Sequence, residues 1–86
     1  MPHVIVKLWP GKTHAQKQAL SDAIVRGVAE TLGYDDEAVS VGFDEVSSVD
    51  WFAKVYGPDI QDRWHTLTKQ PGYGPGSARS IEKLES

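Results

Sequence analysis

The sequence predicts a small α+β protein that is organised around a strand–helix–strand unit. Apolar and polar residues alternate over the first ten residues, apolar residues then recur at helical spacing, and the alternation returns after residue 38. Two strands joined by a crossover helix run parallel, and the crossover is right-handed. Because 86 residues can form only one core, we expect a single domain with its core over residues 2–73. Residues 74–86 are expected to form a polar tail that frays or docks as one helical turn.

The first strand is predicted from His3 to Trp9. Its more apolar face is formed by every second residue, which is the period of a strand, and comprises Val4, Val6 and Leu8. A proline and a glycine follow directly and end the strand.

A helix is predicted from residue 14 to residue 32. Thr13 can cap this helix while the side chain of Gln16 reaches back, which is the reciprocal pattern of a capping box. Gly33 stands where a left-handed residue commonly ends a helix. We expect an apolar stripe of the helix to lie on the sheet, and it is formed by Leu20, Ala23, Ile24, Gly27, Val28, Thr31 and Leu32.

The second strand is predicted over residues 39–44, after the acidic segment YDDE. Its period of two places Val39, Val41 and Phe43 on one face and Ser40, Gly42 and Asp44 on the other. The predicted helix covers one face of this two-stranded sheet. The other face and the edges still need partners.

The second half predicts two short helices. The first begins with Asp50 as its N-cap and ends at Tyr56, with Gly57 closing it. Pro58 suits the first turn of the second helix. That helix has a stripe of Ile60, Trp64 and Leu67, and the segment KQPGYGPG then ends it as a turn.

Composition and charge exclude several classes of function. Nine Lys and Arg residues against twelve Asp and Glu residues give a net charge of -3, and the basic residues do not cluster, so nucleic acid is not an expected partner. The apolar runs are too short to span a membrane and no signal peptide is visible, so we expect no membrane partner. The absence of cysteine is typical of a cytoplasmic protein. A core this small favours self-association.

Pro2 is the most informative single residue. A strand tolerates proline best at its first position, which gives a purely structural interpretation. However, aminopeptidases readily remove a methionine ahead of a residue as small as proline, and we expect removal of Met1 to leave Pro2 with a free secondary amine. Desolvation lowers the pKa of such an amine towards neutrality, where a general base is most effective.

Four segments in order give the chain a specific resemblance. MPHVIVKLWPGKT, the capped helix, SVGFDEVSSVDWF and LTKQPGY together resemble the tautomerase superfamily, whose members are similar to 4-oxalocrotonate tautomerase. The tryptophan after the second strand and the late K-x-PGY resemble its small phenylpyruvate-tautomerase-like branch. The resemblance covers residues 2–73. It implies a βαβ fold whose sheets join across subunits, and an isomerase of the intramolecular oxidoreductase type that needs no cofactor.

The resemblance also implies four site residues. Pro2 would be the general base of a keto–enol tautomerisation of a small 2-oxo acid. Lys12 matches an arginine that binds the substrate carboxylate in the founding family, and Ser40 takes the place of a second arginine on the second strand. Trp51 matches an apolar wall residue that could stack on an aryl ring. The replacement of the second arginine by Ser40 would leave one carboxylate of a diacid poorly matched, and so favours a monoacid with an apolar or aryl body, such as phenylpyruvate.

Each of these assignments has an alternative. Lys12 can be a solvated lysine before a helix, Ser40 a plain sheet-face residue and Trp51 a core residue. Three scattered histidines do not predict a metal site: His3 is more typical of an interface, while His14 and His65 would be exposed on helices. Arg63 and Lys54 could donate charge from a neighbouring subunit.

The alternative function is a tautomerase-like scaffold that only binds small acids or serves as an assembly module. For the assembly itself we expect a homodimer, because residues 46–73 could cover the sheet face that hexameric relatives bury, with a hexamer as the alternative.

Overall fold

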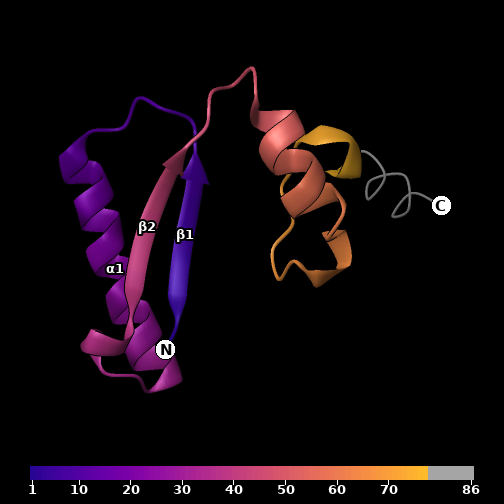
Figure 1. The fold of residues 1–86 in the computed structure, drawn as a ribbon. Coiled ribbons are helices and arrows are strands. Elements are labelled where there is room, and N and C mark those ends of the chain that lie inside the picture. The colour runs from indigo at the N-terminus through magenta and orange to yellow at the C-terminus, as the bar shows by residue number, and fades with distance from the viewer. Residues whose placement is uncertain (78–86) are drawn as a thin grey trace. The chain divides into compact units, whose positions relative to one another are not determined.

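The computed structural model describes residues 1–77 (Figure 1). The chain divides into two compact units, Met1–Val46 and Ser47–Ser86, and each is described by itself. The predicted docking or fraying of the tail concerns mainly residues 78–86, which lie outside the described residues.

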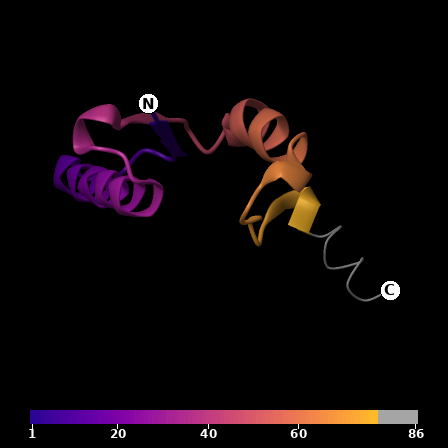
Figure 2. The same ribbon diagram turned by 90° about the horizontal axis from the view of Figure 1, so that it is seen from below.

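The first unit is the predicted strand–helix–strand unit. Strand β1 (His3–Leu8) pairs in parallel with strand β2 (Ser40–Glu45), and helix α1 (His14–Leu32) connects them against one face of the sheet (Figures 1 and 2). The strand limits differ by one residue from the prediction. The sequence interpretation missed the 3-10 helix η1 (Asp36–Ala38), which carries the chain from α1 into β2.

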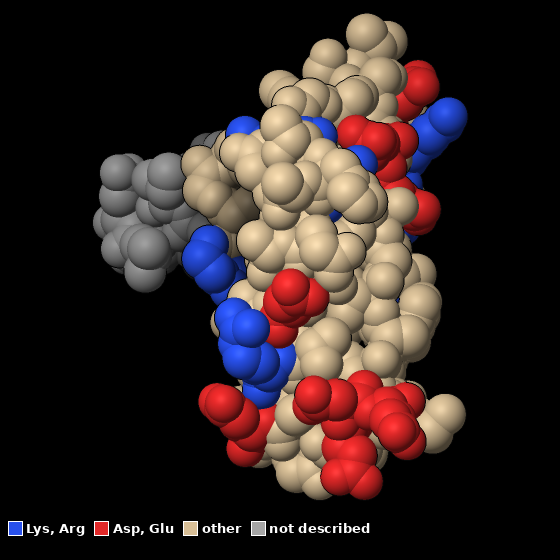
Figure 3. Space-filling view, turned by 90° about the vertical axis from the view of Figure 1, so that its left-hand side faces the viewer, with Lys and Arg blue, Asp and Glu red and all other residues tan. Residues whose placement is uncertain are grey.

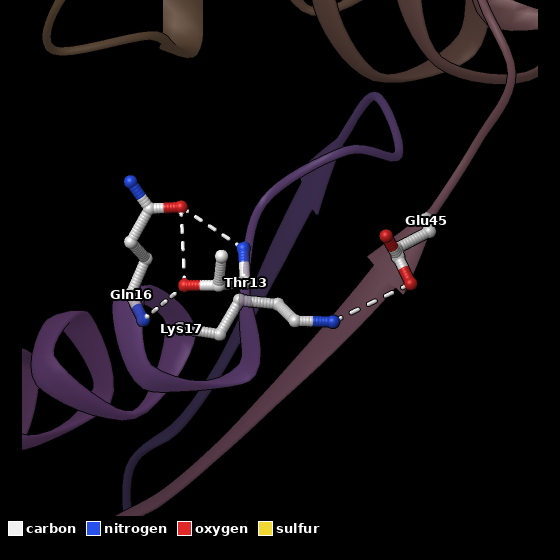
Figure 4. Close-up of polar contacts among 4 residues, drawn as sticks. All are labelled: Thr13, Gln16, Lys17 and Glu45. Carbon is white, nitrogen blue, oxygen red and sulfur yellow. Dashed lines mark hydrogen bonds and ion pairs between the residues drawn. The ribbon is translucent and has the colours of Figure 1, made fainter.

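The start of α1 is fixed by the predicted capping box (Figure 4). The backbone N–H of Gln16 donates to Thr13 Oγ1 at 3.1 Å, and the backbone N–H of Thr13 donates to Gln16 Oε1 at 2.9 Å. Lys17 Nζ in the next position lies 3.4 Å from Glu45 Oε1 at the end of β2. At the other end, Gly33 has φ 77° and its N–H donates to the carbonyl of Ala29, as the left-handed cap requires. The loop after β1 and the end of β2 are thereby tied to the first turn of α1.

The predicted apolar stripe of α1 is only partly correct. Ile24 and Val28 are half-buried as expected, but Leu20 and Leu32 are 44% and 61% exposed. Ala23, Gly27 and Thr31 are exposed as well, and the half-buried face instead comprises Lys17, Ser21, Ile24, Val25, Val28 and Ala29. Two strands are only about 10 Å wide, so the sheet covers a narrow face of the helix and leaves the rest of its apolar surface uncovered.

Alternation in β1 follows the prediction. Val4, Val6 and Leu8 are half-buried, whereas His3, Ile5 and Lys7 are exposed. Nevertheless the first unit buries no side chain fully: the buried apolar side chains of the described residues are Trp51, Val55 and Tyr56, all in the second unit.

The second unit corrects the prediction of two helices that meet at Gly57. A single π-helix, η2 (Phe52–Gln61), runs through both Gly57 and Pro58, and the 3-10 helix η3 (Trp64–Thr66) follows. In a π-helix the N–H of a residue bonds five positions back, as the N–H of Asp62 does to the carbonyl of Gly57 at 3.0 Å. Proline clashes with the carbonyl four residues before it in an α-helix, and we attribute the wider turn to relief of that clash.

An aromatic cluster holds the second unit together. Trp51 Nε1–H donates to the Tyr73 hydroxyl at 2.9 Å, and the Tyr56 hydroxyl donates to the Tyr73 carbonyl at 3.2 Å. The N–H of Gly76 then donates to the Tyr56 hydroxyl at 3.0 Å. The segment that the sequence predicts as a turn is therefore fastened to the helix η2.

Two glycines allow this close approach. Gly74 has φ 84°, and a side chain there would collide with the ring of Tyr56. A Cβ atom on Gly76 would lie 2.6 Å from the ring of Trp64. Residues 74–77 accordingly belong with the packed part of the unit and not with a free tail.

Among residues 1–77, no helix has both the length and the apolar character that crossing a lipid bilayer requires.

We predict that Thr13→Ala lowers the free energy of unfolding by about 1 kcal/mol, because the cap hydrogen bond to Gln16 is lost. Thr31→Ala is the matched control: Thr31 is exposed in the last turn of the same helix, and alanine is the better helix former. Urea unfolding followed by circular dichroism, at equal protein concentration, measures both variants. Equal stabilities for the two would contradict the role of the capping box.

We predict that Gly74→Ala destabilises the second unit by about 2–4 kcal/mol, because the substitution adds both left-handed strain and a collision with Tyr56. Gly72→Ala serves as the control, since no atom lies near its Cβ position and its φ is not left-handed. Thermal unfolding followed by tryptophan fluorescence reports mainly on this unit, because Trp51 and Trp64 lie in it and only Trp9 lies in the first unit. A Gly74→Ala chain as stable as Gly72→Ala would show that the glycine segment is not packed as described.

Candidate functional site

The parallel pairing gathers three polar or reactive groups at the start of the sheet, which we call the Pro2 end. Pro2 is half-buried, and its carbonyl accepts the backbone N–H of Ser40 at 3.2 Å. Ser40 lies opposite His3 in the register, and its Oγ is 2.6 Å from His3 Nδ1. Sequence reasoning named Pro2 and Ser40 separately, and the structure brings them together because two parallel strands begin at the same edge.

Met1 decides whether Pro2 can act as a base. Met1 is 93% exposed and directly precedes Pro2. While Met1 is attached, the Pro2 nitrogen is a tertiary amide, and an amide nitrogen has no basic lone pair. Removal of Met1 would leave a secondary amine at the same position, directly beside His3 and Ser40.

Lys12 lies at the opposite end of the sheet from Pro2. It is exposed and stands between the end of β1 and the N-cap Thr13. The six residues of β1 separate the two positions by about 17 Å along the strand. One chain therefore does not bring its own Lys12 to its own Pro2.

Acidic residues lie in the segment that leads from α1 into the start of β2. Figure 3 shows carboxylate side chains gathered at the end of the first unit where α1 stops and η1 begins. They are exposed, and they comprise Glu30, Asp35, Asp36 and Glu37. An anionic substrate that approaches this end meets repulsive charge, so a bound carboxylate needs a cation close to it.

The structure places Trp51 in the aromatic cluster of the second unit. Only 9% of Trp51 is exposed, and its indole N–H is already bonded to Tyr73. Phe52 and Tyr73 beside it are 50% and 43% exposed, and their ring centroids lie 6.4 Å apart in an edge-on arrangement. Sequence reasoning missed these two rings, although the adjacent tryptophan and phenylalanine and the PGY turn were the signals that could have indicated them.

The remaining candidates show no site of their own. His14 and His65 are exposed, as expected. Within residues 1–77 no group of three or more His, Asp or Glu side chains is placed to hold a metal ion. Lys54 pairs with Asp50 on the same helical face at 3.5 Å. Arg63 is exposed between η2 and η3.

The comparisons agree with the predicted resemblance. Residues 2–58 match a family model described as tautomerase enzyme. A probable tautomerase of Xylella fastidiosa is 45% identical over 74 residues, which cover 86% of this chain and 90% of the relative. Tautomerase PptA of Cronobacter sakazakii is 35% identical, over 85% of this chain and 97% of the relative.

A solved structure supports the same assignment. TomN, a 4-oxalocrotonate tautomerase homologue in the tomaymycin biosynthetic pathway, is 31% identical with a TM-score of 0.58, covering 79% of this chain and all of TomN. The fold predicted from the sequence is thereby confirmed. The chain belongs to the tautomerase family, a family of isomerases, and has PptA-type tautomerases among its relatives.

Proposed function

We propose that the chain is a cofactor-independent keto–enol tautomerase that uses the amino-terminal proline, Pro2, as general base on a small 2-oxo acid. The single observation that carries the proposal is the position of Pro2. It directly precedes β1 at the end of the sheet where both strands start, beside the polar side chains of His3 and Ser40, in a chain of the tautomerase family.

The proposed reaction moves one proton between carbon and oxygen. The lone pair of the Pro2 amine takes a proton from the carbon next to the 2-oxo carbonyl, and the electron pair of that C–H bond becomes the carbon–carbon double bond of the enol. The Pro2 ammonium then gives a proton to the carbonyl oxygen, and the amine is neutral again. In the opposite direction the Pro2 ammonium returns the proton to carbon, so the substrate is isomerised without net oxidation or reduction.

A complete site of this kind needs more than one chain. Lys12 can meet Pro2 only if a second copy places the end of its β1 beside the start of the first copy's β1. The first unit also leaves apolar side chains uncovered, namely Ile5, Trp9, Leu20 and Leu32, at 51%, 55%, 44% and 61% exposure. Burial of such side chains between copies would stabilise a chain with so small a core. We therefore propose a homo-oligomer, with a homodimer as the preferred form and a cytoplasmic location.

The proposed substrate is a monoacid with an aryl or apolar body, such as phenylpyruvate. Lys12 supplies one positive charge without the planar fork of an arginine, and Ser40 supplies none, so a diacid would leave one carboxylate poorly matched. For the aryl group we keep Trp51 as the predicted apolar wall.

The second candidate is a scaffold that binds small acids without catalysis. Lysine and serine at the two positions where the founding family has arginine favour it. The first test is to measure the intact mass of the chain. A chain that retains Met1 has no basic amine at Pro2, so only the binding function would remain.

We predict that Pro2→Ala lowers kcat/KM for the enol of phenylpyruvate by about 100-fold, because a positioned base contributes roughly 10²–10⁴-fold. The assay follows loss of the enol absorbance with chains whose mass shows that Met1 is absent. Pro10→Ala is the matched control, since Pro10 lies after the other end of β1. Equal rates for Pro2→Ala and the unaltered chain would remove the base assignment.

We predict that Pro2→Ala and Lys12→Ala chains, each impaired alone, regain activity when they are unfolded together and refolded as a mixture. In random homodimers half of the molecules pair one chain of each kind, and each of these has one intact site, so about a quarter of the unaltered activity returns.

The two variants refolded separately and mixed afterwards provide the control. Activity of the co-refolded mixture no higher than that control would show that Lys12 does not act across chains. Full activity of Lys12→Ala alone would exclude Lys12 from the site, and light scattering that gives six subunits would overturn the homodimer.

A further inference from the structure

His3 is the side chain at the Pro2 end that the proposed function leaves without a role. It forms the first register pair of the sheet with Ser40, and the two side chains share one sheet face. His3 Nδ1 lies 2.6 Å from Ser40 Oγ, which is within the range of a strong hydrogen bond. Both residues are exposed, and both adjoin the residue whose nitrogen is the proposed base.

The chemistry of this contact provides donors for a ligand in either charge state of the imidazole. When the ring is neutral, Ser40 Oγ–H donates to Nδ1, and the ring proton stands on Nε2. When the ring is cationic, Nδ1–H donates to Ser40 Oγ, and both Nε2–H and the serine hydroxyl proton can donate outward. The cationic pair therefore presents two donors and a positive charge, which is the combination that binds a carboxylate most strongly.

The acidic side chains near the start of β2 would repel a carboxylate ligand, so a carboxylate that binds there needs a cation beside it. Asp35, Asp36 and Glu37 flank or lie in η1, directly before β2, and Glu30 lies in the last turns of α1. On the sheet face itself, Lys7 and Asp44 oppose each other in the register, about 13 Å along the strands from His3. Lys12 of the same chain lies at the far end of β1. Among the described side chains of the first unit, His3 is therefore the one on this sheet face that can place positive charge next to Ser40.

We propose that His3 and Ser40 together bind the carboxylate of a small organic acid, with the His3 imidazolium supplying the charge that Ser40 lacks. This inference rests on the proposed function, since it assigns the substrate carboxylate to a position beside the Pro2 amine. It makes His3 a substrate-binding residue that acts together with Ser40. It also gives this end of the sheet one position for a carboxylate.

The first test measures benzoate binding by calorimetry to chains that have lost Met1. Asparagine can keep a hydrogen bond to Ser40 but cannot carry a positive charge. His3→Asn should therefore weaken binding about tenfold, as expected for loss of a charge-assisted hydrogen bond. Ser40→Ala should also weaken it, and the double variant should bind about as weakly as His3→Asn alone, because the two residues act as a unit. His65→Asn is the matched control and should bind as the unaltered chain does.

The second test is the dependence of binding on pH. Benzoate affinity of the unaltered chain should fall with rising pH more steeply than that of His3→Asn, because only the protonated imidazole carries a positive charge. His3→Asn retains the Pro2 amine, Lys7, Asp44 and the acidic residues around η1. The difference between the two pH profiles therefore measures the contribution of His3 to benzoate binding. In turnover of phenylpyruvate, His3→Asn should raise KM about tenfold with kcat changed less than about threefold.

Three results would overturn the inference. Unchanged benzoate affinity of His3→Asn would do so, as would identical pH profiles for this variant and the unaltered chain. A changed oligomeric mass of His3→Asn in light scattering, with unchanged affinity per chain, would make His3 an interface residue instead.

The Pro2→Ala chain separates this inference from the proposed function. We expect it to lose turnover and to keep a benzoate affinity that still depends on His3. Normal turnover of Pro2→Ala would overturn the base assignment, whereas the comparison of His3→Asn with the unaltered chain would still decide the role of His3.

Discussion

The hydrogen bond from the backbone N–H of Ser40 to the carbonyl of Pro2 is the constraint on which the rest of the first unit depends. It begins the parallel pairing of β1 with β2 and so sets the register of every pair that follows. A shift by one residue would turn Ser40 to the face of Val4 and separate it from His3. One backbone register thus fixes both the half-buried face under α1 and the polar group beside Pro2.

The weak core of the first unit links stability to the proposed activity. Two strands and one helix leave half of the sheet and part of α1 uncovered, and no side chain of this unit is fully buried. Because the whole of β1 lies between them, Lys12 is also far from Pro2 within one chain. In the proposed assembly, contacts with a second copy would cover the exposed apolar surface of the sheet and of α1. They would also bring Lys12 of the second copy to the site. Folding and catalysis would then require the same neighbour.

The second unit follows a different principle. Its stability comes from a cluster of aromatic rings joined by hydrogen bonds, not from an apolar stripe on a regular helix. Gly57 and Pro58 are typical helix-ending residues, which is why the sequence predicted two helices there. The π-helix passes through both, because its wider turn relieves the clash of Pro58 and the packing of Trp51 and Tyr56 against the segment around Tyr73 stabilises one continuous helix. Local propensity does not contain that information.

The sequence alone determined the strand–helix–strand order, the capping box at Thr13, the left-handed Gly33 and the candidate base Pro2, because these follow from residue type and local spacing. Only the tertiary structure decided which face of α1 meets the sheet, that His3 bonds to Ser40, and that Lys12 lies at the opposite end from Pro2. These facts depend on strand register and on the direction of packed elements. Both arise from contacts between residues far apart in the chain, and a one-dimensional pattern does not specify them.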